Sequence, residues 1–140
     1  MGRVMAIDFG MRRIGVALSD PLRIMAQGFE TINWNGVDAE FALNRLTEIV
    51  SEKEVTEIVM GKPSRTDGTA SETEGKAVKF ADLLEERVGI RPVYRDERFT
   101  TVIASQFLRQ TGVSGKDKKK VVDQVAAEII LQEYLDMHRA

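Results

Sequence analysis

Carboxylates stand where apolar elements of this sequence end or meet a buried face. Asp8 closes the apolar run that begins at Val4, and Asp96 and Glu97 close a second run. Because side chains alternate along a strand, only one of Asp96 and Glu97 can share a site with Asp8. Asp123 borders the apolar face of the last helix that the periodicity predicts. Three acidic positions are therefore candidates for a single site.

Converging carboxylates would carry a specific chemistry. Two of them 4 Å apart repel by about 4 kcal/mol at an effective dielectric constant near 20, so a cluster must be protonated or bound to a metal. Ligation by oxygen alone favours Mg²⁺ or Mn²⁺ over zinc. Two such ions about 4 Å apart clamp the attacking and leaving oxygens of a phosphoryl displacement. The pattern thus predicts metal-dependent phosphodiester hydrolysis.

Each carboxylate also has a simpler interpretation. Asp8 can be a turn residue that bonds its own backbone. The acids at 96 and 97 can form surface ion pairs with the neighbouring arginines, which contribute little. Asp123 can be favoured by the dipole near the start of a helix. In that case the chain is an α/β domain whose acids never meet.

Composition narrows the function classes. The chain has 140 residues, a net charge of −2, no cysteine and one histidine, His138. The length predicts a single domain over residues 1–140. Without cysteine there is no disulfide framework, thiolate zinc site or cysteine nucleophile, and a cytoplasmic location fits. We identify no signal peptide and no membrane-spanning run, so we expect no membrane partner.

Positive charge gathers at the start of the last predicted helix. Lysines there oppose the helix dipole, unless a phosphate backbone meets both the lysines and the N-terminal N–H groups. A solvated loop is the alternative. The segment GKPSRTDG, residues 61–68, could be a lid or could hold phosphate. The candidate nucleic-acid contacts are Arg12, Arg13, Lys62, Arg65, Arg98, Lys116, Lys118, Lys119 and Lys120.

The elements that would position these residues follow from periodicity. Strands are predicted over 4–8, 13–19, 24–32, 56–60 and 91–97, and the first two form a hairpin. Helices are predicted after Asn35-Gly36 with Asn35 or Asp38 as the cap, over 77–88, over 101–110 and over 121–134. The last has an apolar stripe made of Val122, Val125, Ala126, Ile129 and Ile130. Three strands followed by alternating units indicate an α/β fold with a mixed sheet and helices on its faces.

Four segments resemble, in order, the signatures of the YqgF/RuvX family: AIDFGMRRIGVALSD, VMGKPSRTDGTAS, DERFTT and KKKVVDQVAAEIILQEYLD. Members of this family are described as Holliday junction resolvases or pre-16S ribosomal RNA nucleases. The resemblance spans nearly the whole chain. It implies a ribonuclease H-like fold with a five-stranded mixed sheet whose first three strands are antiparallel. Gly61-Lys62-Pro63 departs from the usual family pattern, because a lysine replaces an apolar residue.

The resemblance also implies catalytic and metal-binding roles for Asp8, Glu97 and Asp123, and so selects Glu97 over Asp96. Asp8 would be shared by two Mg²⁺ or Mn²⁺ ions, and the other two acids would each complete one coordination sphere. Metal-activated water would attack the phosphorus. Actin-like and sugar kinase folds share the aspartate-phenylalanine-glycine turn, but they need two such domains, and this length holds one.

The expected function is therefore a metal-dependent endonuclease acting on structured nucleic acid. We favour maturation of the 5′ end of pre-16S ribosomal RNA, with ribosomal precursor particles as partners. Resolution of branched DNA at Holliday junctions is the alternative, and a non-catalytic assembly factor that binds nucleic acid is another. Nothing in the sequence identifies a dimer face, so a monomer or weak homodimer is expected.

Overall fold

The five strands form one mixed sheet. A computed structural model describes residues 2–34, 38–62, 72–96 and 116–138. Its strands are β1 (Arg3–Asp8), β2 (Arg13–Ser19), β3 (Ala26–Asn33), β4 (Val55–Lys62) and β5 (Val93–Asp96). They lie in the order β3-β2-β1-β4-β5, with β1 antiparallel to β2 and parallel to β4. The expected mixed sheet with three antiparallel strands is confirmed.

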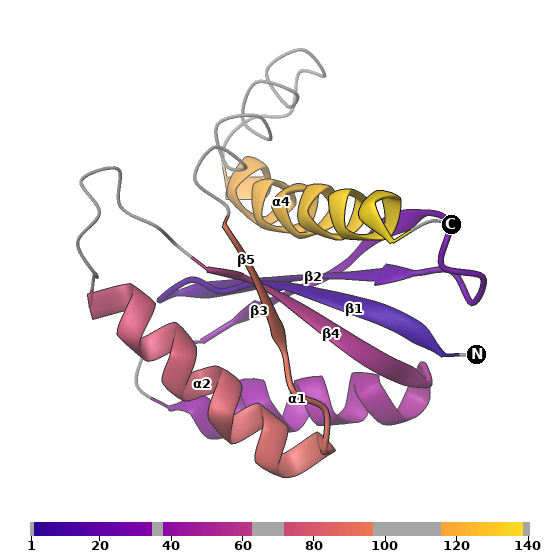
Figure 1. Cartoon of the computed structure of the whole chain (residues 1–140). Helices are drawn as coiled ribbons and strands as arrows, with labels where there is room; N and C mark the ends of the chain where they lie inside the picture. The colour runs from indigo at the N-terminus through magenta and orange to yellow at the C-terminus, as the bar shows by residue number, and fades with distance from the viewer. Residues whose placement is uncertain (1, 35–37, 63–71, 97–115, 139–140) are drawn as a thin grey trace.

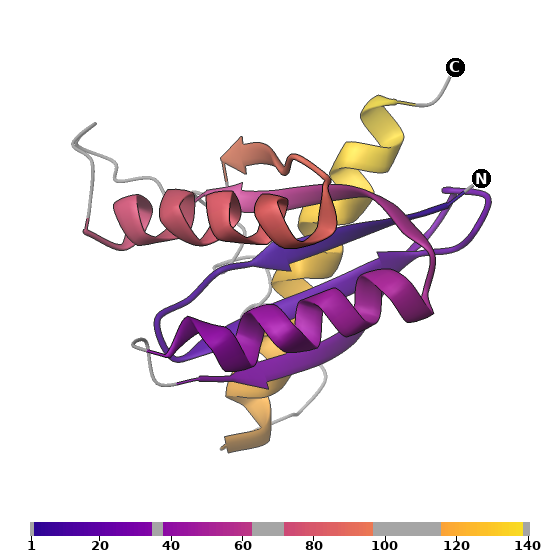
Figure 2. The same ribbon diagram turned by 90° about the horizontal axis from the view of Figure 1, so that it is seen from below.

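Helices cover both faces of this sheet (Figures 1 and 2). Helices α1 (Ala39–Glu52) and α2 (Glu72–Val88) lie on one face, and α4 (Lys116–Met137) lies on the other. Strand β1 is buried on both sides, because Met5 and Ile7 join the core beneath α1 and α2, whereas Val4 and Ala6 join the core beneath α4. Alternation therefore directs Asp8, two residues beyond Ala6, to the α4 face.

Element boundaries differ from the predictions where local chemistry intervenes. Asp38, one of the two predicted caps, accepts the Glu40 N–H with its side chain and starts α1. Strand β3 begins at Ala26 rather than 24, because the Asp20 carboxylate accepts the N–H groups of residues 24 and 25 and holds them in a turn. Strand β5 begins at 93 rather than 91, since Pro92 has no N–H to donate. The helix predicted over 101–110 lies outside the described residues.

Helix α4 crosses the strands at close range. Its buried residues are Ala126, Ala127, Ile130, Leu131, Tyr134 and Leu135. The predicted stripe is confirmed at Ala126 and Ile130 and wrong at Val125 and Ile129, which are only half-buried. The sheet selects this face because its glycines contact the helix: a Cβ at Gly28 would lie 3.2 Å from that of Gln124. Small residues at such a contact let a helix approach the sheet backbone closely.

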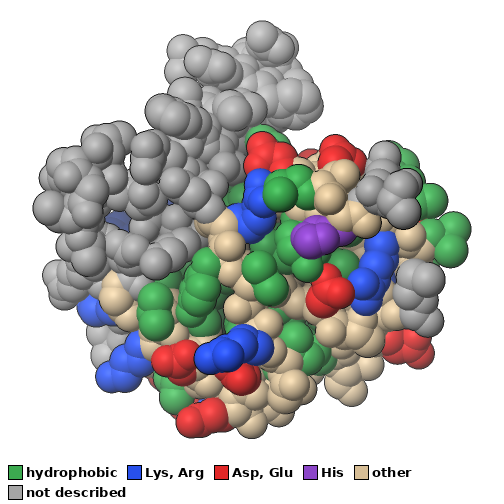
Figure 3. Space-filling view, in the orientation of Figure 1, with side chains coloured by type: hydrophobic (Ala, Val, Ile, Leu, Met, Phe, Trp, Pro, Cys, Tyr) green, Lys and Arg blue, Asp and Glu red, His purple; other side chains and the backbone are tan. Residues whose placement is uncertain are grey.

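The two edges of the sheet are β3 and β5. Hydrophobic side chains are exposed along β5 (Figure 3), where Val93 is 45% and Tyr94 38% accessible.

In the part of the chain that the structure describes, every helix is too short or too polar to cross a bilayer.

Candidate functional site

Asp8 is the last residue of β1. In the sheet register it pairs with Gly15 on the neighbouring strand β2 and with Gly61 on the other neighbouring strand, β4. The side chain is buried, with the residue 9% exposed, and faces α4. Neither glycine places a side chain beside this carboxylate. A carboxylate buried at a strand end needs a partner that compensates its charge.

Gly15 brings the helix and the sheet together at this point. A Cβ at Gly15 would lie 2.5 Å from the carbonyl carbon of Asp123 and 3.1 Å from its Cβ. The α4 backbone therefore rests directly on β2, one residue across the sheet from Asp8. Two of the three predicted acids, far apart in the sequence, thus come together on one face of the sheet.

Arg13 binds Asp123 at the edge of this site. Its Nε donates to Oδ2 over 2.7 Å, and the two side chains are 32% and 18% exposed. Burial raises the pKa of Asp123 above its usual value, and the hydrogen bond and positive charge of Arg13 oppose that rise. Arg13 was predicted as a nucleic-acid contact, and the structure shows in addition that it partners a candidate catalytic acid.

An aromatic cluster holds the turn between Asp8 and Arg13. Trp34 donates from Nε1 to the Gly10 carbonyl over 2.8 Å and from its backbone N–H to the Arg12 carbonyl over 2.9 Å. Its ring lies 5.6 Å from Phe9 and 6.0 Å from Phe80, and those two rings are 5.2 Å apart. Sequence reasoning missed this role of Trp34; the available signal was a single tryptophan beside the predicted Asn-Gly turn.

The remaining predicted residues are described in part or not at all. Arg12 has an exposed side chain. Lys62 ends β4, with Asp96 as its Cα partner on β5, and only its backbone is described. The four predicted lysines lie inside the first turns of α4, which begins at 116 rather than 121. Glu97, Arg65 and Arg98 lie outside the described residues.

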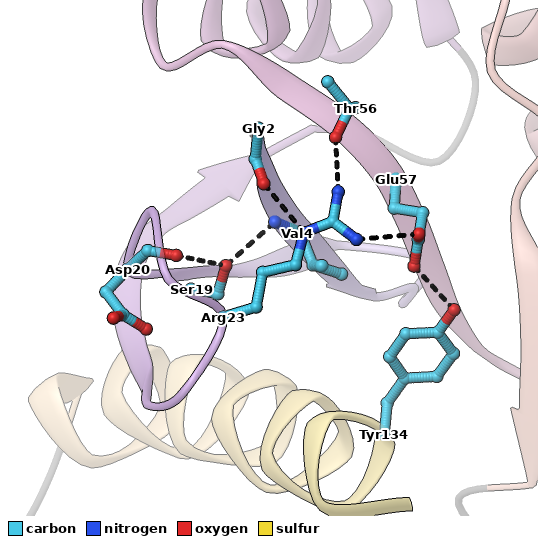
Figure 4. Close-up of polar contacts among 8 residues, drawn as sticks. All are labelled: Gly2, Val4, Ser19, Asp20, Arg23, Thr56, Glu57 and Tyr134. Atoms are coloured by element: carbon cyan, nitrogen blue, oxygen red, sulfur yellow. Dashed lines mark hydrogen bonds and ion pairs between the residues drawn. The ribbon is translucent and has the colours of Figure 1, made fainter. Parts of the chain in front are cut away.

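A second polar network anchors the other half of α4 (Figure 4). Arg23, at φ 58°, donates to the Gly2 carbonyl, Glu57 and Thr56 over 2.8, 2.9 and 2.6 Å. The Tyr134 hydroxyl donates to Glu57 over 2.7 Å. That bond, with Arg23, lowers the pKa of Glu57, while burial and Glu57 raise the pKa of Tyr134 to about 12. Helix α4 is thus tied to β2 near Asp123 and to β4 near its C-terminus.

The donor chemistry fits a hard divalent cation. Asp8 and Asp123 offer only oxygen ligands, which hard divalent cations prefer, and both lie on the α4 face of the sheet beside Gly15. Among the described residues no group of three acids or histidines is close enough to hold a metal. A third protein ligand would therefore have to come from outside them, where Glu97 lies.

The matches to known proteins cover nearly the whole chain. The sequence model of a family described as "RuvX: Holliday junction resolvase" matches residues 2–137. A protein from Acetivibrio thermocellus named "Putative pre-16S rRNA nuclease" is 45% identical, with 96% of this chain and 95% of that one covered. One of the same name from Ligilactobacillus salivarius is 43% identical, with 97% and 93% covered.

Solved structures with the same fold include two resolvases. RuvC of T. thermophilus, in complex with a Holliday junction substrate, has a TM-score of 0.58 at 13% identity, covering 99% of this chain and 97% of that one. The fowlpox virus resolvase, in complex with Holliday junction DNA, has a TM-score of 0.59 at 9% identity, with 96% and 97% covered. At these identities the likeness establishes the fold, which is ribonuclease H-like.

Proposed function

Because this chain belongs to the RuvX (YqgF) family, we propose that it is a divalent-metal-dependent nuclease that matures the 5′ end of pre-16S ribosomal RNA. The observation that carries the proposal is the meeting of Asp8 and Asp123 across Gly15. Two carboxylates that lie close together on one face of a sheet repel each other. A shared divalent cation would compensate both charges.

Glu97 is the third acid in this proposal. Arg95 on β5 contacts Glu133 and Met137, so its side chain lies on the α4 face. Glu97 lies outside the described residues, and we propose it over Asp96 as the acid that joins Asp8 because the family resemblance implies the catalytic role for position 97.

Asp8, Glu97 and Asp123 would together hold Mg²⁺ or Mn²⁺, and we propose two ions. Such ions supply Lewis-acid stabilisation of the phosphoryl oxygens and an activated water. The chain itself fixes the acids: the ladder of β1 holds Asp8, and the contact with Gly15 holds Asp123. Arg12, exposed on the adjoining turn, would bind a backbone phosphate.

Two observations bear on the substrate. The relatives at 45% and 43% identity are named for pre-16S ribosomal RNA, and they match over nearly their full length. The resolvases bound to Holliday junctions share the fold at only 13% and 9% identity. The closer similarity favours RNA, and we place the reaction in the cytoplasm, where bacterial ribosomes are assembled. Junction cleavage is the second candidate, favoured by the description of the family.

The proposal is tested by cleavage of both substrates with one preparation. Purified protein with Mn²⁺ or Mg²⁺ is incubated with a pre-16S RNA fragment and with a four-way DNA junction. We expect cleavage of the RNA, its loss in Asp8→Asn, and retention of RNA binding in that variant. Asp82→Asn, the same change at an exposed position of α2, is the matched control and should cut normally.

The other outcomes refute the proposal in different ways. If Asp8→Asn cuts as well as the wild type, the metal site is not at Asp8. Preferential cutting of the junction would make the protein a resolvase. If the wild type binds RNA but cuts neither substrate with either metal, it is an assembly factor rather than a nuclease.

A further inference from the structure

Arg13 and Asp123 form an ion pair that is partly exposed to solvent. The Arg13 Nε lies 2.7 Å from the Asp123 Oδ2, and both side chains are partly exposed, at 32% and 18%. This bond uses Nε, and the guanidinium carries two further Nη groups that can donate hydrogen bonds. One face of Arg13 thus holds a candidate metal ligand, while the other is available to a ligand from solution.

The backbone of Arg13 is fixed, whereas its side chain is long. Arg13 is the first residue of β2 and pairs with Asn33 on β3. It lies two residues before Gly15, so both face α4. The turn before it is held by the hydrogen bond from Trp34 to the Arg12 carbonyl. The guanidinium can therefore change partners by rotation of its own side chain while the strand stays in place.

Charge decides between the two partners. A guanidinium on Oδ2 and a divalent cation on the same carboxylate compete for its lone pairs and repel each other. A phosphodiester offers two non-bridging oxygens, which the planar fork of guanidinium donors can bind in a bidentate manner. When a metal and a backbone phosphate are both present, the guanidinium of Arg13 is therefore expected to leave Asp123 and bind the phosphate.

We propose that Arg13 is a positioning residue that exchanges between Asp123 and a substrate phosphate, and so couples metal binding to nucleic-acid binding. Before substrate binds, Arg13 compensates the half-buried charge of Asp123 and weakens the affinity of the site for metal. When a backbone phosphate takes the guanidinium, Asp123 is released to the metal. This inference rests on the proposed nuclease function.

Thermodynamic linkage makes the coupling measurable from either side. If nucleic acid raises metal affinity by some factor, metal must raise nucleic-acid affinity by the same factor. If Arg13 had only a structural role, its removal would change metal affinity in the opposite direction. If the guanidinium only held Asp123 in place for the metal, its removal would weaken metal binding whether or not nucleic acid were present.

The test is a titration of the full chain with Mn²⁺, with and without a short stem–loop RNA. The electron paramagnetic resonance signal of free Mn²⁺ measures how much of the metal is unbound. Measurements at 4 °C, with the RNA checked on a gel afterwards, separate binding from cleavage. For Arg13→Gln without RNA we expect Mn²⁺ affinity to rise by about 5-fold or more. RNA should tighten Mn²⁺ binding to the wild type by a similar factor, and this gain should vanish in Arg13→Gln.

Two further variants isolate the mechanism. Arg91→Gln removes a positive charge outside the site, since the Arg91 side chain is 86% exposed and pairs with Glu85. It should therefore leave Mn²⁺ affinity without RNA near that of the wild type. Arg13→Lys keeps the charge but loses the planar fork. Arg13→Lys should retain weak Mn²⁺ binding without RNA, and RNA should raise its Mn²⁺ affinity by a smaller factor than in the wild type. It also replaces Arg13→Gln as the test variant if that protein fails to fold.

The failure of this inference is distinguishable from the failure of the proposed function. Equal or weaker Mn²⁺ binding by Arg13→Gln without RNA, with the wild type binding normally, overturns the exchange and leaves the nuclease standing. If the wild type binds no Mn²⁺, or Asp123→Asn binds it as tightly, the metal site itself is wrong and both proposals fall.

Discussion

Gly15→Ala should separate the acids that we assign to the site. The added Cβ would lie 2.5 Å from the Asp123 carbonyl carbon, a backbone atom that cannot rotate away. The Asp123 carbonyl oxygen would lie closer still, so restoring ordinary contacts of about 3.4 Å requires α4 to withdraw from β2 by at least about 1 Å. The substitution therefore shifts Asp123 relative to Asp8 without altering either acid.

Two effects of different size follow. Overpacking of this kind typically lowers the free energy of unfolding by about 1–3 kcal/mol. A domain of ordinary stability, about 5–15 kcal/mol, stays folded after such a loss. Misplacement of a catalytic group by about 1 Å can cost roughly 100-fold in rate. We therefore expect cleavage to fall far more than stability.

The assay pairs urea unfolding with cleavage of the preferred substrate at a temperature where every variant is folded. Gly75→Ala is the matched control, because Gly75 lies in α2 and a Cβ there would meet nothing within 4 Å. It should raise the free energy of unfolding by up to about 1 kcal/mol and leave cleavage unchanged. Gly15→Ala with wild-type stability and wild-type cleavage would refute the close approach of α4 as the source of the geometry.

Two other contacts give predictions of known sign. Trp34→Phe removes the 2.8 Å bond to the Gly10 carbonyl, so it should lower the free energy of unfolding by about 1 kcal/mol in urea and slow cleavage. An unchanged cleavage rate would show that the turn needs no such anchor. Tyr134→Phe removes the main cause of the lowered pKa of Glu57, so it should destabilise the protein at neutral pH. That difference should shrink in acid, because stability from a lowered pKa is lost as pH falls through the folded-state value. The raised pKa of Tyr134 has the opposite dependence: the wild type should lose stability between pH 10 and about 12, and Tyr134→Phe should lack that loss. Parallel pH curves for the two proteins would contradict both assignments.

Local periodicity made most elements predictable. The strands at 4–8 and 13–19 and the helix after Asp38 lie where apolar spacing and capping residues indicate them. Such signals are encoded within a few neighbouring residues, and so a sequence shows them directly. The position of Asp123 beside the buried alanines of α4 was predictable for the same reason.

Errors arose where a distant segment sets the local structure. The buried face of α4 includes Ala127 and Leu131 rather than only the predicted stripe, because the glycines of β2 and β3 determine which side of the helix fits. The role of Trp34 depends on a hydrogen bond to a turn 24 residues earlier. The choice of Glu97 over Asp96 came from family resemblance, since alternation alone does not assign a face to either residue.

The sequence by itself determined which residues could do chemistry: an acid at a strand end, an acid on a helix face, and a set of cations around them. Only the tertiary structure decided which of these meet. Arg13 and Asp123 are 110 residues apart and form one ion pair, and Asp8 lies across the sheet from the glycine on which Asp123 rests. The physical reason is that side-chain type is a local property, whereas proximity is set by strand register and by the depth at which a helix packs.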